Sequence, residues 1–267
     1  MSSRPRLERE PVDLPVVFGA LGAVWDGIVA LADALSELPW TVVGGQMVFL
    51  HAAEAGVDVH RISVDIDAAV DLRADPAGLK KLVAALVALG FESTGQSPEG
   101  HAHRFERPIE AGVAVVDLTV GGEDDNVIKV DVLAPEGLGP NTDLRTIGTG
   151  TAFPIPGVSQ ALDRTEIVPV RVAGSVHWVP RPSLLGAIVA KATAVTVDHV
   201  DTDRHREDLG FLCGLVVDPF SLADGLTPKD RRRLRAAANQ LGPDHRAWRA
   251  ARVPLDAQLA LETLIGD

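Results

Sequence analysis

The chain has 267 residues, of which 46% are hydrophobic and 23% charged, and it carries a net charge of −12. This length and composition are typical of an ordered protein with one large or two smaller domains, and they exclude an intrinsically disordered chain. The acidic balance argues against broad non-specific nucleic-acid binding, and the single cysteine, Cys213, excludes an internal disulfide and a cysteine-rich zinc site. No apolar run is long enough to span a membrane, and the charged N-terminus lacks the apolar core of a signal peptide. We therefore expect a cytoplasmic protein, which we take to be a monomer.

The pattern of residues 14–55 predicts a helix, a short strand and a second helix, in that order. Apolar residues at helical spacing predict a helix over residues 14–38, which Pro39 ends. A short apolar strand over residues 40–43 runs into Gly44 and Gly45, and a helix over residues 46–55 follows. Glycine lets a backbone approach a ligand closely, and a helix N-terminus offers free N–H groups, so this arrangement can hold a phosphate. Glycine pairs also mark ordinary tight turns, and that alternative stays open.

The middle of the chain alternates between strand and helix patterns. We predict a strand over residues 61–71, a helix over residues 75–89, and further strands over residues 101–106, 113–120 and 127–134. The acidic turn over residues 121–126 favours a solvated hairpin tip over a calcium loop, because it lacks calcium-loop spacing. Residues 135–165 predict a long, partly ordered excursion with one short helix near Gln160. Two alternating segments, 168–172 and 176–179, predict a hairpin.

The character of the chain changes near residue 180. Ser183 can cap a helix that runs from Leu184 to Val197. A second helix starts near Asp203, a third opens at Thr227 and Pro228, and a fourth ends at Leu264. We therefore predict an α/β fold of the α+β kind: a mixed-sheet domain over residues 1–180, on which the helix of 14–38 packs, and a helical domain over residues 181–267.

One strand carries a row of functional side chains. With the period of two of a β-strand, Arg61, Ser63, Asp65 and Asp67 point to one face, and Ile62, Val64 and Ile66 to the other. Two carboxylates this close are unfavourable unless a positive charge lies between them, and a divalent cation commonly supplies it. A solvated strand face is the alternative for an isolated pair of this kind.

A third carboxylate would strengthen a metal site. The strand over residues 127–134 places Lys129, Asp131 and Leu133 on one side, and it ends at Pro135. Asp117 lies in a similar strand and competes for the same role. We favour Asp131, because the end of a strand is where a site opens.

These motifs together resemble the polymerase-β type of nucleotidyltransferase. The similar segments are V-V-G-G-Q-M-V-F-L-H, R-I-S-V-D-I-D, H-R-F and K-V-D-V-L-A-P, followed by P-R-P-S-L-L-G-A-I-V-A-K-A-T-A and D-R-H-R-E-D-L-G-F-L. Within that superfamily the chain is most similar to the AbiEii-like toxins of abortive-infection and toxin–antitoxin systems. The resemblance spans roughly residues 40 to 213.

The resemblance implies a Mg²⁺ site, with Mn²⁺ as the alternative metal and an NTP as the substrate. Asp65, Asp67 and Asp131 would hold the metal, and Asp131 would also orient or deprotonate the attacking hydroxyl. In-line attack on the α-phosphate would then release pyrophosphate. The residues that would contact the nucleotide are Gly44, Gly45, Arg61, Ser63, Arg204, His205 and Asp208. Lys191 would reach in from the helical domain and act as a catalytic residue with the three aspartates.

Several features depart from the family pattern or allow another interpretation. Gly44-Gly45 stands where many relatives have Gly-Ser, and 19 residues separate Gly45 from Asp65. Where many relatives read Lys-Asp-x-x-Asp-Leu, this chain reads R-H-R-E-D-L from Arg204, so the first aspartate is replaced or shifted to Asp203. Lys191 can instead snorkel from an alanine-rich helix, and His205 can be a surface helix residue.

The C-terminal part carries a basic segment. Residues 229–252 hold eight Lys or Arg and two Asp, a balance of 8 − 2 = +6. A run of arginines (Arg231, Arg232, Arg233 and Arg235) favours a solvated helix face, and its alternative is a dock for a tRNA or other RNA acceptor. The resemblance also implies a cognate antitoxin as a partner. The other functions that stay open are nucleotidylation of a small molecule or protein, and nucleotide binding without catalysis.

Overall fold

The computed structural model describes residues 4–15, 19–109, 127–198 and 202–266. Its strands are β1 (Val12–Asp13), β2 (Trp40–Val43), β3 (Asp65–Val70), β4 (Glu92–Ser93), β5 (Arg104–Pro108), β6 (Val127–Pro135), β7 (Phe153–Ile155), β8 (Thr165–Val172) and β9 (Ser175–Pro182). Its helices are α1 (Gly19–Ala34), α2 (Gly44–Ala55), α3 (Gly78–Ala88), α4 (Val158–Asp163), α5 (Leu184–Val197), α6 (Thr202–Cys213), α7 (Pro219–Ala223), α8 (Pro228–Leu241) and α9 (Pro254–Ile265), with a 3₁₀ turn, η1, over Arg246–Ala250. The α/β fold class expected from the sequence is confirmed.

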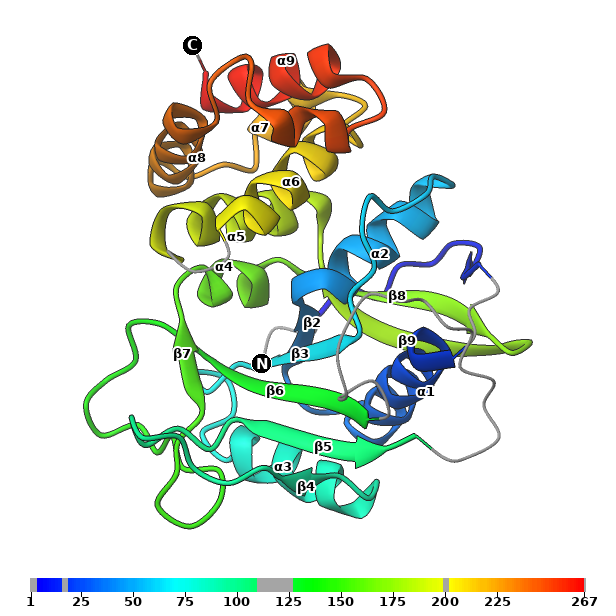
Figure 1. Cartoon of the computed structure of the whole chain (residues 1–267), viewed down its shortest axis with the longest axis vertical. Coiled ribbons are helices and arrows are strands. Elements are labelled where there is room, and N and C mark those ends of the chain that lie inside the picture. The colour runs from blue at the N-terminus through cyan, green and yellow to red at the C-terminus, as the bar shows by residue number, and fades with distance from the viewer. Residues whose placement is uncertain (1–3, 16–18, 110–126, 199–201, 267) are drawn as a thin grey trace.

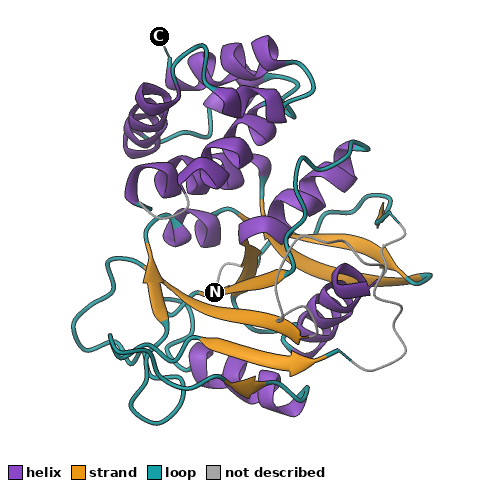
Figure 2. Ribbon diagram, in the orientation of Figure 1, coloured by secondary structure: helices purple, strands orange, loops and turns teal. Residues whose placement is uncertain are grey.

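The larger sheet places β3 and β6 side by side at its centre. Its strand order is β2-β3-β6-β5-β4, and β7 pairs with the end of β6. β3 runs antiparallel to β2 and parallel to β6, while β5 runs antiparallel to β6. Figures 1 and 2 show this sheet at one end of the molecule and α5 to α9 stacked at the other, with α2 and α4 between them.

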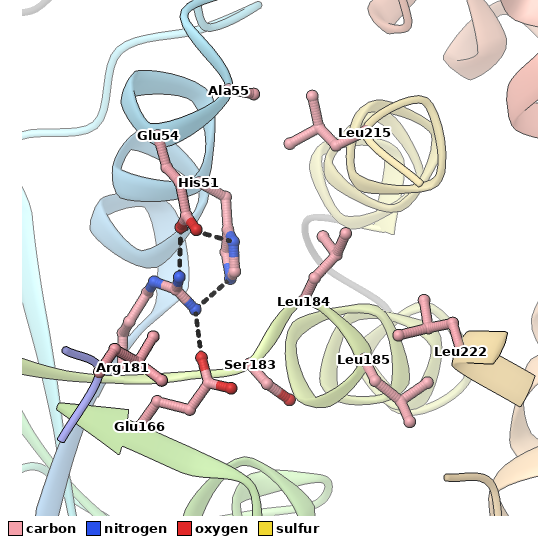
Figure 3. Close-up of a pocket in the computed structure, with 11 residues that line it drawn as sticks. His51, Glu54, Ala55, Glu166, Arg181, Ser183, Leu184, Leu185, Leu215 and Leu222 are labelled. Atoms are coloured by element: carbon pink, nitrogen blue, oxygen red, sulfur yellow. Dashed lines mark hydrogen bonds and ion pairs between the residues drawn. The ribbon is translucent and has the colours of Figure 1, made fainter. Parts of the chain in front are cut away.

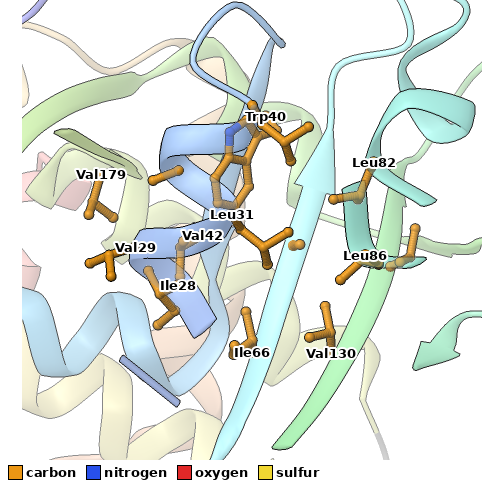
Figure 4. Close-up of a cluster of buried hydrophobic side chains, with 14 of the residues drawn as sticks. Ile28, Val29, Leu31, Trp40, Val42, Ile66, Leu82, Leu86, Val130 and Val179 are labelled. Carbon is orange, nitrogen blue, oxygen red and sulfur yellow. The ribbon is translucent and has the colours of Figure 1, made fainter. Parts of the chain in front are cut away.

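The two faces of this sheet are covered by different helices. Ile66 and Val130 point from β3 and β6 into a core shared with Ile28 and Leu31 of α1 and with Leu82 of α3 (Figure 4). On the opposite face, a smaller cluster joins strands β2, β3 and β6 to α4 and α5; it consists of Val43, Ala69, Leu133, Val158, Ala161 and Leu162, with Ala190 against it. That cluster covers only the far end of the face, so the positions before it on β3 and β6 are left for polar side chains.

The remaining elements form a small sheet and a helical layer. The small sheet has the order β1-β8-β9, with β8 and β9 antiparallel. The helical layer has its own apolar core, which includes Leu209 and Leu212 of α6 and Leu234 of α8. Met47 and Val48 of α2 belong to that same core. Helix α2 therefore contacts β3 as well as the helical layer.

Several predicted elements are confirmed. Helix α5 runs over Leu184–Val197 as expected, and the Ser183 hydroxyl accepts a hydrogen bond from the Gly186 N–H at 3.3 Å. Helix α8 begins at Pro228 after a capping box at Thr227, α4 forms near Gln160, and β8 and β9 form the expected hairpin. The division into residues 1–180 and 181–267 stays a prediction. The strand expected over 113–120 and the turn over 121–126 lie outside the described residues.

Other boundaries were wrong. The strand expected over 61–71 begins only at Asp65, where its pairing with Lys129 of β6 starts, while β2 reaches only as far as Asp67 because the chain turns after Val43 into α2. Ile62 and Val64 therefore lie outside the core, with 52% and 40% of their surface exposed. The helix expected over 14–38 is the shorter α1, and α7, η1 and β7 were not predicted. Among the described residues, no helix is both long and apolar enough to cross a membrane.

Candidate functional site

The strand register brings three predicted carboxylates to one face of the larger sheet. Asp67 of β3 lies beside Asp131 of β6, and Asp65 lies beside Lys129. Because side chains alternate along a strand, Asp65, Asp67 and Asp131 share the face opposite Ile66 and Val130. The predicted grouping of these carboxylates on neighbouring strands is thus present, while the position of Asp117 falls outside the described residues.

Asp67 lies close to two other carboxylates and to two cations. Burial is the main cause that raises the pKa of Asp67 to about 6, and the neighbouring Asp131 and Asp65 act in the same direction. Lys191 and Arg204 oppose that increase, so both cations lie close enough to act on the carboxylate. Asp67 forms no hydrogen bond or ion pair with another described side chain. A group with these neighbours favours an additional positive charge.

The glycine pair fits against this strand. Gly44 has a φ of +66°, and a Cβ placed on it would lie 1.7 Å from the Asp67 Oδ2. A Cβ on Gly45 would lie 2.3 Å from the Ser63 Cβ. Helix α2 therefore begins in direct contact with Asp67 and Ser63. This close packing is in itself a reason for two glycines, and phosphate binding by their N–H groups stays a prediction.

Asp131 is already bonded to an arginine that the sequence analysis did not select. Arg104 of β5 lies opposite Asp131 in the antiparallel pair. Its Nε and Nη2 donate to the two carboxylate oxygens at 2.8 and 2.7 Å. The hydrogen bonds that Arg104 donates to Asp131 raise the pKa of Arg104, which therefore stays charged. Arg104 stands in the H-R-F segment, but its position opposite Asp131 depends on strand pairing.

Asp208 of α6 is the centre of a buried ion-pair cluster. Arg61 donates to it through Nε at 2.9 Å and Nη2 at 2.7 Å, and the Lys191 ammonium lies 2.6 Å from the Oδ2. His60 Nε2 lies 3.1 Å from the Oδ1, without hydrogen-bond geometry. Burial alone would raise the pKa of Asp208, but the attraction of Lys191, His60 and Arg61 outweighs it and holds the pKa well below its usual range.

This cluster bonds two predicted cations to Asp208, Lys191 in a buried position and Arg61 in a partly buried one. Lys191 is 5% exposed, so it does not snorkel, and Arg61 lies in the segment before β3 with its guanidinium on Asp208. Arg61 and Lys191 come from the sheet layer and the helical layer respectively, and Asp208 joins them. Whether either cation binds phosphate stays a prediction.

Arg204 and His205, the other two predicted residues of α6, lie in different environments. Arg204 is exposed and acts on Asp67. His205 is partly buried, with its Nε2 2.9 Å from an Asp198 oxygen, and burial followed by Lys191 lowers its pKa. Its imidazole is therefore neutral at pH 7 and bonded to a carboxylate. Gln46, which was not predicted, is buried and donates to the Ser63 carbonyl at 2.6 Å.

The arginines of α8 lie on a different part of the helical layer. Arg231 donates to the carbonyls of Leu264 and Ala223 at 2.7 and 2.9 Å. Arg233 bonds Glu136, and Arg235 donates to the Ile265 carbonyl. Arg232 is exposed. Arg231, Arg233 and Arg235 thus take part in internal contacts.

The comparisons with known proteins show a likeness to a solved structure. No family model and no curated protein matches the chain. The chain is similar to the crystal structure of an antigenic nucleotidyltransferase-like protein from Paracoccidioides brasiliensis, with a TM-score of 0.51 and 14% sequence identity. The match covers 88% of this chain and 94% of that one. The chain has a nucleotidyltransferase-like fold. At this identity the likeness concerns the fold alone, and the AbiEii-like assignment stays a prediction.

Proposed function

We propose that this protein is a Mg²⁺-dependent nucleotidyltransferase that moves a nucleotide from an NTP to an acceptor. The observation that supports this most is the position of Asp65, Asp67 and Asp131 on one face of two adjacent strands. Burial and the neighbouring Asp131 and Asp65 raise the pKa of Asp67 although Lys191 and Arg204 act against the increase, and a carboxylate in this setting favours a further positive charge. The shared fold with a nucleotidyltransferase-like protein agrees with this activity.

Asp65 and Asp67 fit a magnesium ion better than Asp131 does. Mg²⁺ prefers oxygen ligands, and in nucleotide sites it is commonly held by one or two carboxylates together with substrate phosphates. Both oxygens of Asp131 accept hydrogen bonds from Arg104. Among the described residues, no group of three or more His, Cys, Asp or Glu is arranged to hold a metal. We therefore assign the metal to Asp65 and Asp67 with the phosphates of the NTP, and Asp131 becomes a ligand only if Arg104 moves.

The protein would supply orientation and charge around the reacting phosphate. When bound, Mg²⁺ contributes positive charge to the phosphate oxygens and to the departing pyrophosphate. Arg104 can bond to the triphosphate in place of Asp131, which leaves that carboxylate to accept the proton of the attacking hydroxyl. The hydroxyl oxygen bonds to the α-phosphorus as the bond to the bridging oxygen breaks. Lys191 and Arg204 face the same carboxylates from the helical layer.

The acceptor and the biological role rest on the sequence resemblance. We propose RNA, with tRNA as the first choice, as the acceptor, and the role of a toxin that a cognate antitoxin controls. The arginines of α8 support an RNA dock less than the sequence suggested, because Arg231 and Arg233 are bonded within the protein. Arg232 and Arg204 are the exposed cations that we would test first for RNA contact.

A second function has a specific observation in its favour. Arg104 neutralises Asp131, and Asp208 neutralises Lys191. A protein that keeps both pairs when an NTP binds would hold the nucleotide without transferring it. This alternative predicts NTP binding with no product.

Incubating the protein with each α-labelled NTP, Mg²⁺ and total tRNA separates these functions. Label on RNA supports the proposal, and label on a protein or small molecule supports a different acceptor. Bound NTP without any labelled product supports the second function. Asp65→Asn should abolish transfer, whereas Asp26→Asn, which changes an exposed aspartate of α1, should leave it unchanged.

A further inference from the structure

A cavity of about 440 Å³ lies beside the C-terminal half of α2, and Asp65, Asp67 and Asp131 are not among the residues that line it. Figure 3 shows its walls: His51 and Glu54 of α2, Glu166 of β8 and Arg181 of β9 on one side, and leucines of the helical layer on the other. Its size falls within the range of small-molecule sites, about 300–1,000 Å³. Neither the metal site nor the proposed transfer uses these residues.

Both terminal nitrogens of Arg181, the arginine of this cavity, are already hydrogen-bonded. The Arg181 side chain is 2% exposed. Its Nη1 donates to the Pro182 carbonyl at 2.7 Å and to Glu166 at 3.3 Å, and its Nη2 donates to Glu54. Its Nε is buried without a partner in the described structure. Arg181 therefore holds the two carboxylates in place but offers no terminal nitrogen to a ligand.

His51 offers no positive charge either. Its Nε2 lies 3.1 Å from the Pro182 carbonyl. Burial, and next the charge of Arg181, lower its pKa well below its usual range. An anion in this cavity would meet a neutral imidazole, two carboxylates, and an Arg181 whose terminal nitrogens are already bonded.

Glu166 is the carboxylate of this cavity that can accept a further hydrogen bond. Glu54 is bonded to Arg9 as well as to Arg181. Glu166 shares Arg181 through one oxygen only, and no described residue donates to its other oxygen. Burial, with Glu54 nearby, raises the pKa of Glu166. Its side chain is 27% exposed, so a ligand can reach it.

The opposite wall is apolar. It is formed by leucines of α5, α7 and the turn after α6: Leu184, Leu185, Leu215 and Leu222. Most of these side chains are only half-buried, so apolar surface remains for a ligand to cover. An apolar ligand gains free energy in proportion to the leucine surface that it removes from water.

We propose that this cavity binds a small amphipathic cation, in which a primary ammonium or guanidinium group bonds Glu166 and an apolar chain lies among the leucines. The positive group completes the hydrogen bonds of the carboxylate, and the apolar part contacts α5 and α7. Helices α2 and α5 both line the cavity and also carry Gly44 and Lys191. The ligand would thus contact the two helices that carry residues of the transfer site.

The test uses hexylammonium as the probe, with the full-length protein and no nucleotide. Isothermal titration at pH 7.5 should give saturable binding of hexylammonium, at least about tenfold tighter than hexanol or hexanoate, because a hydrogen bond to a charged group contributes that much. Glu166→Gln should weaken hexylammonium binding about tenfold while leaving hexanol binding unchanged. Leu222→Ala should weaken hexylammonium more than it weakens methylammonium.

Glu92→Gln is the matched control, since Glu92 is an exposed carboxylate on β4, far from the cavity. If hexanoate binds as tightly as hexylammonium, or if Glu166→Gln binds the ammonium as the wild type does, the proposal is wrong. If Glu166→Gln does not fold, the test uses Leu222→Ala with hexylammonium and methylammonium. A larger loss of hexylammonium binding supports the proposal, and equal losses contradict it. Because no NTP is present, failure here leaves the proposed transfer activity untouched.

Discussion

The Lys191 ammonium lies 2.6 Å from the Asp208 Oδ2, inside the structure and not at its surface. The same carboxylate accepts two hydrogen bonds from Arg61, which belongs to the sheet layer. Asp208 is therefore the point at which a cation of α5 and a cation of the segment before β3 are held together. This cluster therefore joins the helical layer to the segment that precedes the carboxylates of β3.

Replacing Asp208 with Asn should destabilise the protein strongly. Asn keeps the size of the side chain but leaves the buried Lys191 and the partly buried Arg61 without their counter-charge. The loss of one partner from a buried ion pair costs about 3–5 kcal/mol of unfolding free energy. Urea denaturation at pH 7 measures this change. Asp26→Asn should lie within about 0.5 kcal/mol of the wild type, as exposed substitutions do, and equal stability of the two variants would contradict the role of the cluster.

Asp208 should also make the fold acid-sensitive. Its pKa in the folded protein is held well below the ordinary value of 3.8, so the unfolded chain binds a proton more readily than the folded one. This stabilisation is present in full above about pH 4 and is lost as the pH falls below 3.8. Below that pH, the stability difference between the wild type and Asp208→Asn should shrink. Thermal unfolding between pH 3 and pH 7 measures it, and a difference that stays constant over that range would refute this assignment.

Gly44 and Gly56 provide a matched pair for the start of α2. Both have a positive φ, +66° and +65°, but a Cβ would meet Asp67 only at Gly44 and open space at Gly56. Alanine at either position costs about 1–2 kcal/mol of backbone strain. Only Gly44→Ala should also displace Asp67, and it should therefore reduce transfer by more than tenfold while Gly56→Ala keeps near wild-type activity. Similar activity in both variants would mean that the contact with Asp67 does not matter.

The site could be predicted only in part from the sequence, for physical reasons. Alternation along a strand places Asp65 and Asp67 on one face whatever the strand pairs with, and a Ser183 cap marks the start of α5 locally. The partner of a charged residue depends instead on tertiary packing. Asp208 is 147 residues from Arg61 in the chain, and the pairing of Arg104 with Asp131 requires the β5–β6 register.

The start of β3 shows the same limit. Residues 61–67 alternate as a strand should, yet only the part from Asp65 onward pairs. The neighbouring strand β2 ends at Val43 because the chain turns there into α2. Alternation alone contains no information on where a neighbouring strand stops. As a result, Arg61 and Ser63 lie beside the site in an irregular segment.

The hydrogen bonds between Arg104 and Asp131 predict that Asp65 contributes more to Mg²⁺ binding than Asp131 does. Asp65→Asn should weaken Mg²⁺ binding, measured with a non-hydrolysable NTP by titration calorimetry, by at least tenfold. Asp131→Asn should weaken it less, because Arg104 already occupies both oxygens of Asp131. Arg104→Gln should strengthen metal binding, since it frees a third carboxylate next to Asp67. Equal losses for Asp65→Asn and Asp131→Asn would show that Arg104 leaves Asp131 when the nucleotide binds.

Substitutions of the α8 arginines should distinguish residues that stabilise the fold from residues that bind RNA. Arg231→Ala removes two hydrogen bonds to carbonyls at the ends of α9 and α7, and we expect it to cost about 1–3 kcal/mol in urea denaturation. Arg232→Ala changes an exposed residue and should leave stability unchanged. If RNA docks on this helix, Arg232→Ala should lower the salt dependence of RNA binding by about one unit of slope. An unchanged slope would remove α8 from the RNA-binding surface.

The most direct test of the account is transfer of label from an NTP, with α-labelled and γ-labelled NTP compared in parallel. The wild type and Asp26→Asn should transfer the α-label to an acceptor in the presence of Mg²⁺ and release the γ-label as pyrophosphate, and Asp65→Asn should do neither. Transfer of the γ-label would identify phosphoryl transfer instead. Undiminished α-label transfer by Asp65→Asn would contradict the assignment of the active site to Asp65 and Asp67.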